Sequence, residues 1–361
     1  MVRVGLIGFG LAGRAFHAPM IRGVPGMELA CIVERSGSRA QQRYPDVRVV
    51  RTLEELLADR QIQVCVVATP NPTHFDVARQ CLLEERHVVV DKPLVTNLRD
   101  AEELFRQARE HKRLLTVYQN RRWDGDFQTV KKLVESGVLG RMAEYEARYD
   151  RFRLNPKPNA WGERAQPGSG LLFDLGPHLI DQALLLFGAP LAITASAFRQ
   201  REWSVVEDAF DVCLEYSWWR AMLRSRTIAY APGPHFVIHG THGSFEKYGM
   251  DPQEEPLRKG QAPDGFDWGP HWGEDPERQW GTLSLAVGGS VQKVKSEAGD
   301  YRGFYANLRD AVTQGAPLAV TPEQALETMR AIQMAYRSSR ERRTVSWDEG
   351  ADERKDDSRA R

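Results

Sequence analysis

Three ionisable side chains, Lys92, Asp174 and His178, have the types and positions expected of a site that acts on a hydroxyl group. An imidazole can accept a proton from a hydroxyl because its pKa lies near neutral pH. Lys92 follows the strand-like run 87–90, where an ammonium group can stabilise a developing oxygen. Asp174 and His178 have the spacing i, i+4, so we expect both on one face of a helix that begins near Asp174. The alternatives are a solvated lysine, a helix-capping aspartate and a packed histidine.

A glycine-rich loop near the N-terminus forms a second candidate site, Gly8-Phe9-Gly10-Leu11-Ala12-Gly13. The loop follows a strand-like run and opens a helical one, which is the arrangement that binds dinucleotides. Its glycines permit a tight turn, the close approach of a pyrophosphate and tight packing of helix on strand, and the start of the helix stabilises phosphate. We therefore predict a bound cofactor, NAD or NADP.

The end of the second strand-like run bears on the choice between these cofactors. Glu34 lies 21 residues after Gly13, where a carboxylate can accept hydrogen bonds from the adenosine ribose and would repel a 2′-phosphate. This position slightly favours NAD. Arg35 and Ser36 follow at once, however, and a guanidinium with a hydroxyl can hold a 2′-phosphate. NADP therefore stays open.

The elements that must position these residues fall into two classes along the chain. Up to about residue 120, strand-like and helical runs alternate, which predicts a doubly wound parallel sheet, an α/β Rossmann domain, over residues 1–120. Later runs, including 141–150, 191–199 and 208–219, alternate apolar and polar residues as antiparallel strands do. We expect an α+β domain with a large open, mostly antiparallel sheet over 121–347, with C-terminal helices that pack back on the first domain. Residues 348–361 are charged and predicted to be a disordered tail.

Charge and cysteine content exclude several classes of partner. Basic and acidic residues balance at 49 each, so no net field favours nucleic acid or an anionic membrane. The four cysteines lack CxxC spacing and fall mostly in apolar runs, as buried thiols of a reducing compartment do. A strand begins at about residue 2, which leaves no room for a secretory signal. We expect a cytoplasmic protein with a small-molecule substrate.

Three motifs resemble the Gfo/Idh/MocA oxidoreductase family, named for glucose-fructose oxidoreductase and inositol dehydrogenase. They are Ala68-Thr-Pro-Asn-Pro-Thr-His74, Asp91-Lys92-Pro93 and the stretch from Gly170 through Asp174 to His178. The family more often has glutamate where Asp91 stands. The resemblance implies that Lys92, Asp174 and His178 are catalytic, with His178 as general base. It also implies that cofactor contacts include Thr69, Pro70, Asn71, His74, Asp91, Lys92 and, from the region before the Gly-rich loop 167–170, Trp161. Capping is the alternative for Asn71 and His74.

Two further stretches, 118–124 and 239–248, resemble the subgroup that contains NADP-dependent scyllo-inositol dehydrogenases. Asn120, Trp123 and Asp124 can contact a polyol through amide, ring and carboxylate groups, whereas Arg121 can equally form an ion pair between the domains. We expect no metal site, because Asp174 and His178 lack a third clustered ligand. Trp218 and Trp219 are adjacent on a strand, so one must leave the core; a homodimer or homotetramer through the C-terminal sheet would bury it.

The combined pattern predicts reversible oxidation of a secondary hydroxyl of a cyclic polyol or sugar to a ketone, with hydride transfer to nicotinamide C4. One alternative is a nucleotide-binding sensor or structural protein without activity, since fold alone does not fix function. Another is the same fold acting on a non-sugar substrate such as an imine, a pigment or a dihydrodiol.

Overall fold

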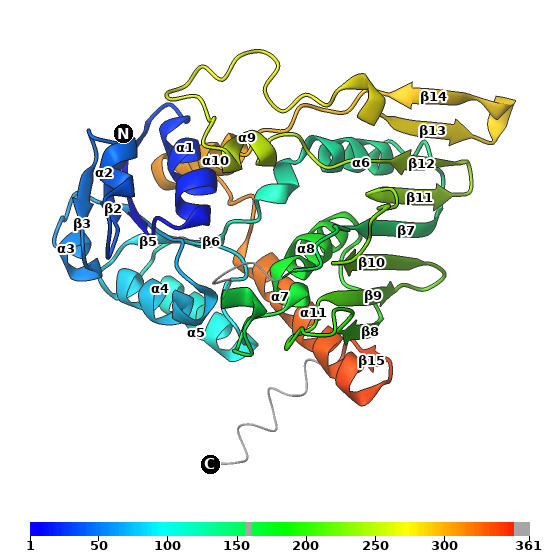
Figure 1. Ribbon diagram of the computed structural model, residues 1–361, viewed down its shortest axis with the longest axis horizontal. Coiled ribbons are helices and arrows are strands. Elements are labelled where there is room, and N and C mark those ends of the chain that lie inside the picture. Colours follow the sequence, from blue (N-terminus) through cyan, green and yellow to red (C-terminus); the bar gives the residue numbers. More distant parts are fainter. Residues whose placement is uncertain (156–160, 350–361) are drawn as a thin grey trace. The chain divides into compact units, whose positions relative to one another are not determined.

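The computed structural model describes residues 1–155 and 161–349, and in this part the chain divides into two compact units (Figure 1). Unit 1 comprises residues 1–125, 251–274 and 298–326, and unit 2 comprises 126–250, 275–297 and 327–361. Neither unit is continuous in sequence, because the chain returns twice to unit 1 after leaving it at Gly125. The prediction treats 121–347 as one domain whose C-terminal helices pack back on the first. Residues 298–326 do belong to unit 1, whereas the return at 251–274 was not predicted. The predicted tail lies almost wholly outside the described residues.

Unit 1 is built on a six-stranded parallel sheet of order β3-β2-β1-β4-β5-β6. This order is that of a doubly wound nucleotide-binding domain and confirms the predicted fold class. All of β4 and the three valines of β5 are buried, as expected where helices cover both faces of a parallel sheet. The strands are β1 (Val2–Ile7), β2 (Met27–Val33), β3 (Arg48–Val50), β4 (Val64–Val67), β5 (His87–Val90) and β6 (Leu115–Val117).

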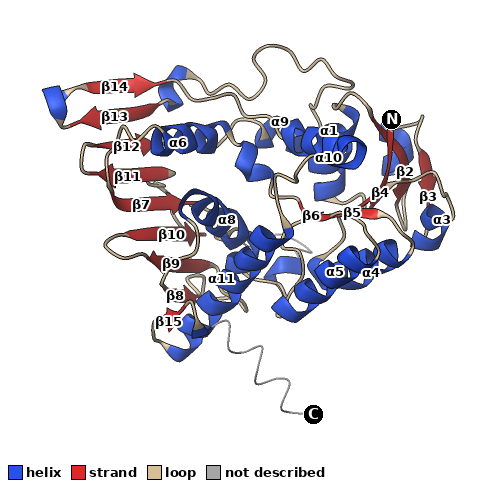
Figure 2. Cartoon of the chain, turned by 180° about the vertical axis from the view of Figure 1, so that it is seen from behind, coloured by secondary structure: helices blue, strands red, loops and turns tan. Residues whose placement is uncertain are grey.

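The helices of unit 1 pack on this sheet from two sides, α4 and α5 on one and α1 with α10 on the other (Figure 2). Helix α5 begins where Asn97 accepts a hydrogen bond from the Asp100 amide, a common N-terminal cap. The helices are η1 (Gly13–His17, a π-helix), α1 (Ala18–Arg22), α2 (Arg39–Arg43), α3 (Leu53–Leu57), η2 (Asn71–Thr73), α4 (His74–Leu83), α5 (Leu98–Glu110), η3 (Asn120–Trp123), α9 (Glu254–Arg258) and α10 (Arg302–Gln314).

Unit 2 is built on a nine-stranded sheet of order β14-β13-β12-β11-β7-β10-β9-β8-β15. The pairing of β10 with β7 is parallel and the other pairings are antiparallel, which confirms the predicted mostly antiparallel sheet. The strands are β7 (Met142–Arg148), β8 (Ala192–Phe198), β9 (Ala209–Glu215), β10 (Arg220–Arg226), β11 (Phe236–Gly240), β12 (Gly243–Lys247), β13 (Gly281–Leu285), β14 (Val291–Val294) and β15 (Val345–Ser346). Sequence patterning missed β3, β12, β13, β14 and β15, whose short or polar runs lack clear alternation.

One face of the nine-stranded sheet is covered by helices and holds the core of unit 2 (Figures 1 and 2). Phe210, Val212 and Leu214 of β9 are fully buried, as their alternation predicted. The helices are α6 (Gly125–Glu135), η4 (Trp161–Glu163), α7 (Leu171–Asp174), α8 (Gly176–Phe187), η5 (Glu277–Gln279), η6 (Val287–Gly289) and α11 (Pro322–Glu341). Helices α6 and α11 each begin in unit 1 and continue into unit 2.

The opposite face of this sheet carries a ladder of ion pairs across β7, β10 and β9. Arg226 contacts both oxygens of Asp211 at 2.7 Å, and Arg224 lies 3.4 Å from both Asp211 and Glu146. Beside the sheet, Trp218 is 64% exposed, whereas Trp219 stacks on Tyr216 with ring centroids 4.3 Å apart. Both tryptophans lie in the turn between β9 and β10, not on a strand as predicted, and there Trp218 is exposed while Trp219 packs on Tyr216.

Candidate active site

The glycine loop follows β1 and leaves an open cradle at the carboxyl edge of the parallel sheet. Gly8 has φ +101°, and a Cβ on Gly13 would lie 2.1 Å from the Gly8 carbonyl oxygen, so both positions require glycine. A Cβ on Gly10 would meet nothing within 4 Å. The surface beside Gly10 is thus bare backbone that a pyrophosphate can approach, which fits a dinucleotide.

The other predicted loop residues divide between core and surface. Phe9 is buried and packs edge-on against Tyr44, with centroids 6.1 Å apart. Leu11 is exposed, and Ala12 precedes the π-helix η1. The exposed backbone at Gly10 and Leu11 therefore forms the surface that a phosphate can approach, and the buried Phe9 ring holds the loop to the core.

Glu34 lies next to this cradle but its carboxylate turns into the protein. Residues Ile7 and Val33 are directly paired, so the loops that follow β1 and β2 lie side by side. Glu34 is only 4% exposed, and its Oε2 accepts a hydrogen bond of 3.0 Å from the Ala40 amide. Its Oε1 lies 3.4 Å from Nε of Arg39. The carboxylate of Glu34 thus serves the start of α2, a structural role that competes with the predicted hydrogen bonds to ribose.

The loop after β4 holds Thr69, Pro70, Asn71 and His74, which the family resemblance assigned to the cofactor. His74 is fully buried, and its two ring nitrogens lie 2.8 Å from the Thr69 carbonyl and 3.0 Å from the Pro93 carbonyl. Asn71 is also buried, at the start of η2. His74 thus joins the loop after β4 to the loop after β5, which favours the structural alternative for this residue.

Lys92 begins the turn after β5, at the same carboxyl edge as the glycine loop. Its amide donates a hydrogen bond of 2.8 Å to Oδ1 of Asp91, and the peptide bond to Pro93 is cis. Burial raises the pKa of the Asp91 carboxyl, but the His17 ring 3.8 Å away and the charges of Lys92 and His74 hold that pKa below its usual value. Lys92 therefore sits beside an ionised carboxylate, in reach of the nucleotide edge of the sheet.

Asp174 and His178 lie in unit 2, in two different helices. Asp174 is the last residue of α7 and is exposed, with Oδ2 3.4 Å from Arg151. His178 lies in the first turn of α8, is 5% exposed, and meets the edge of the Tyr149 ring at 6.3 Å. The single helix predicted to begin near Asp174 is instead two helices that meet at Leu175, where Pro177 has no N–H to continue the helical hydrogen bonds.

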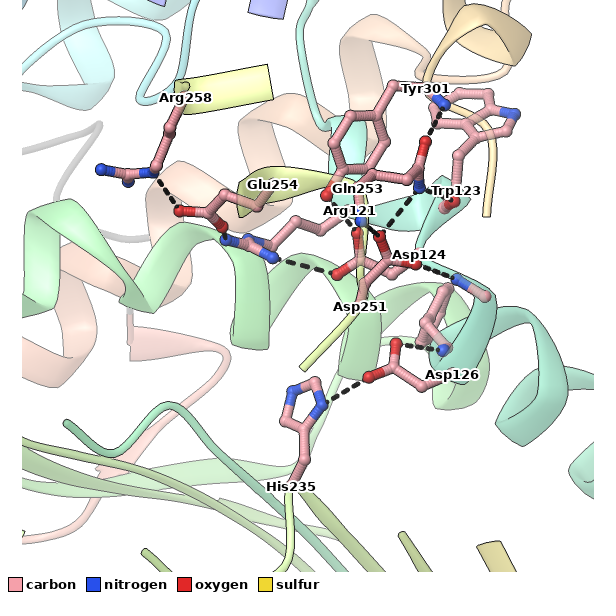
Figure 3. Close-up of polar contacts among 12 residues, drawn as sticks. Arg121, Trp123, Asp124, Asp126, His235, Asp251, Gln253, Glu254, Arg258 and Tyr301 are labelled. Atoms are coloured by element: carbon pink, nitrogen blue, oxygen red, sulfur yellow. Dashed lines mark hydrogen bonds and ion pairs between the residues drawn. The ribbon is translucent and has the colours of Figure 1, made fainter. Parts of the chain in front are cut away.

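The stretch 120–124, predicted to contact substrate, is engaged inside unit 1 (Figure 3). Asp124 is completely buried, and its carboxylate accepts hydrogen bonds from Tyr301 Oη at 2.7 Å and from Arg121 at 3.1 Å. The Trp123 indole packs edge-on against Phe304 at 5.7 Å. Asp124 thus holds α10 to η3, and we no longer assign it to the substrate.

Arg121 is the centre of this network, since its guanidinium also pairs with Glu254 of α9 (Figure 3). Its ion pairs with Asp124 and Glu254 lie within unit 1. Asn120 is buried beside it in η3. The side chain of Trp161, predicted near the cofactor, lies outside the described residues.

Sequence reasoning missed two buried histidines with carboxylate partners. His17 in η1 lies 3.8 Å from Asp91 and 2.6 Å from the Tyr305 hydroxyl. In unit 2, His235 Nδ1 lies 2.7 Å from Asp126, and its ring faces Tyr149 at 4.8 Å. The sequence could have indicated His17 by its position in the first helical turns after the glycine loop.

Within the described ranges, no group of three or more His, Cys, Asp and Glu side chains is arranged to hold a metal.

Searching the described helices for a membrane span finds none that is both long and apolar enough. Three of the cysteines, Cys31, Cys65 and Cys81, are buried free thiols, as predicted, and Cys213 is partly buried.

Comparison with known proteins agrees with this arrangement over nearly the whole chain. Residues 2–119 match the oxidoreductase family model for a NAD-binding Rossmann fold, and residues 131–347 match its C-terminal alpha/beta domain. The uncharacterized oxidoreductase YdgJ of Escherichia coli is 39% identical over 95% of this chain and 98% of its own. The scyllo-inositol 2-dehydrogenase (NADP(+)) IolW of Bacillus subtilis is 37% identical over 95% of each chain.

Solved structures show the same fold. A putative oxidoreductase, yvaA from Bacillus subtilis, superposes with a TM-score of 0.90 at 36% identity, covering 96% of this chain and 98% of that one. A putative oxidoreductase from Yersinia pestis, YPO2259, gives a TM-score of 0.90 at 36% identity, with coverage of 96% and 97%. The cradle at Gly10, the Lys92 turn and these full-length matches show that the chain belongs to the Gfo/Idh/MocA oxidoreductase family, with an N-terminal domain that binds NAD or NADP.

Proposed function

We propose that this oxidoreductase reversibly oxidises a secondary hydroxyl of a cyclic polyol or sugar to the ketone. The observation that carries the proposal is the Lys92 turn, which presents an ammonium group at the edge of the sheet that also carries the dinucleotide cradle. The relative named as a scyllo-inositol dehydrogenase, similar over almost the whole chain, supports a polyol as the substrate.

The chemistry assigned to each residue follows from its charge. A dinucleotide held at the Gly10 cradle would supply nicotinamide C4 as the acceptor of a hydride from the substrate carbon. His178 takes the hydroxyl proton, and Lys92 stabilises the oxygen as it becomes a carbonyl. Asp174, exposed at the end of α7, orients substrate hydroxyls. The C–H and O–H bonds break as the C=O bond forms, so electrons and protons balance.

The test is the absorbance of reduced nicotinamide with purified protein, NAD or NADP, and a panel of inositols, aldoses and sugar acids. We expect turnover of at least one polyol. His178→Ala should lower kcat by about 10²- to 10⁴-fold, the usual contribution of a general base, with the dinucleotide Kd unchanged. His242→Ala, a change of an exposed histidine in the same unit, is the matched control and should leave turnover unchanged. No turnover on the panel, with the dinucleotide bound, would favour the sensor alternative or a non-sugar substrate.

We also propose NADP as the preferred cofactor, which revises the slight preference for NAD drawn from Glu34. The Glu34 carboxylate is committed to Ala40 and Arg39, and the loop 35–39 that it holds is exposed. That loop offers two guanidinium groups, of Arg35 and Arg39, at the place where a 2′-phosphate would lie. The NADP named for the Bacillus subtilis relative supports this choice.

Binding constants for NADPH and NADH test the cofactor choice without any substrate. Arg35→Ala should weaken NADPH about tenfold or more, as expected for one lost charge-assisted contact, and leave NADH unchanged. Glu34→Gln should leave the Kd for NADH unchanged. If the Glu34 carboxylate instead binds the ribose, this change should weaken NADH binding more than NADPH binding. Arg60→Ala is the control, since it removes an exposed guanidinium shortly before β4, at the amino edge of the sheet.

The open face of the nine-stranded sheet is proposed to pack against a second copy of the chain, and light scattering of the purified protein tests this. The cytoplasmic location stays a prediction, supported by the buried free thiols.

A further inference from the structure

The starting observation is a buried polar cluster in unit 1 that none of the preceding assignments uses. His17 is fully buried, and its ring stacks at a tilt on Tyr118, with centroids 4.3 Å apart. Its Nδ1 lies 2.6 Å from the hydroxyl of Tyr305 in α10. Its Nε2 lies 3.8 Å from Oδ2 of Asp91. An imidazole in an apolar interior is costly unless its nitrogens face polar partners. Tyr305 supplies a hydrogen bond at Nδ1, whereas Nε2 makes no direct hydrogen bond and faces the Asp91 carboxylate across 3.8 Å.

The backbone turns His17 toward this cluster. Residues Gly13 to His17 form a π-helix in which the Ala18 amide bonds to the Gly13 carbonyl. One wider turn of this kind inserts a residue into the helix and is found often at functional sites. Here the wide turn comes directly after the glycine loop. The residue that it directs inward is therefore anchored to the nucleotide cradle.

Asp91 connects the cluster to Lys92. One carboxylate oxygen, Oδ1, accepts the hydrogen bond from the Lys92 amide at 2.8 Å. The other oxygen, Oδ2, is the one that faces His17. A rotation of this carboxylate would alter both contacts together, because the two oxygens belong to one planar group. The contact with His17 therefore restrains the start of the turn that carries the Lys92 ammonium.

We propose that His17 is a positioning residue for Lys92, acting through Asp91 and held in place by Tyr305. The cluster thereby connects the helix that follows the nucleotide cradle with the turn that carries Lys92. This inference rests on the proposed function only in the assignment of Lys92 to the substrate. Charged and titratable groups that act on the cluster are Asp91, Lys92, Tyr118 and Tyr305, His74 on the loop after β4, and the carboxylates Asp124 and Asp300 on the side of Tyr118.

The experiment compares His17→Phe with His17→Gln in the full-length protein. Phenylalanine keeps a ring against Tyr118 but removes both polar contacts, whereas glutamine keeps an N–H donor near the position of Nε2. We expect His17→Phe to lower kcat for the polyol at least tenfold, with KM and the dinucleotide Kd within twofold of wild type. His17→Gln should recover most of kcat. His111→Phe, the same change at the end of α5, should leave kcat unchanged.

A second readout does not need turnover. The pH titration of Lys92, followed by NMR of the ¹³C-methylated amine and assigned with Lys92→Arg, should change its midpoint in His17→Phe but not in His17→Gln or His111→Phe. An unchanged Lys92 titration in His17→Phe would overturn the inference. Equal loss of kcat in both His17 variants, together with weaker dinucleotide binding, would also overturn it, because that pattern indicates a structural role only. Absence of polyol turnover in the wild type would refute the proposed function, while the titration would still decide the inference.

Discussion

Glu254 supplies a stability test of the network around Arg121. Its carboxylate, 24% exposed, pairs with Arg121 and accepts a hydrogen bond of 2.6 Å from Arg258. Burial raises the pKa of this carboxyl, but the two guanidinium groups outweigh burial and lower the pKa from 4.5 to about 2. One pKa unit equals about 1.4 kcal/mol, so the ionised form contributes about 3 kcal/mol to unit 1 at neutral pH, and about 2 kcal/mol after allowance for solvent screening.

We therefore expect Glu254→Gln to lower the free energy of unfolding by about 2 kcal/mol at neutral pH. A carboxyl with a lowered folded pKa stabilises the fold above its unfolded pKa of 4.5 and loses that contribution as the pH falls toward about 2. The difference between wild type and variant should accordingly shrink as the pH falls from 4.5 to about 2.

Urea unfolding followed by circular dichroism and tryptophan fluorescence measures this difference, with both probes needed because two units can unfold separately. Glu255→Gln is the matched control, since Glu255 is the next residue of α9 and pairs with Lys259 in solvent. We expect no change in its urea midpoint. If Glu254→Gln unfolds at the wild-type midpoint at neutral pH, or shows a loss that does not depend on pH, the electrostatic reasoning is refuted.

Two further predictions concern the glycine loop and the core of unit 2. Gly13→Ala should lower the melting temperature without ligand, because the new Cβ would lie 2.1 Å from the Gly8 carbonyl oxygen. Gly10→Ala should keep the wild-type melting temperature and lose dinucleotide affinity, and equal melting temperatures for the two variants would contradict this. Asp126→Asn should cost about 3 kcal/mol in urea unfolding at neutral pH, as for a broken buried pair, since His235 loses the carboxylate 2.7 Å away. Burial raises the pKa of Asp126, but the charge of His235 outweighs burial and lowers that pKa. The stability lost in Asp126→Asn should therefore diminish at acid pH, and a loss that grows at acid pH would contradict this reasoning.

Much of the fold was present in local sequence patterns. The buried runs of β4 and β5, the alternation along β9 and the glycines before η1 are short-range features, and each reflects a backbone period or a turn that only certain residues can make. The position of the Lys92 turn could be predicted for the same reason, because the residue that follows a parallel strand must lie at the carboxyl edge of the sheet.

Tertiary structure decided how the charged side chains are used. Glu34 has the spacing of a ribose ligand, but its carboxylate found a nearer donor in the Ala40 amide. His17 and Tyr305 are 288 residues apart, and Asp126 and His235 are 109 apart, so no local pattern connects either pair. A buried polar group must find a partner wherever the chain brings one, and the identity of that partner depends on packing rather than on spacing in the sequence.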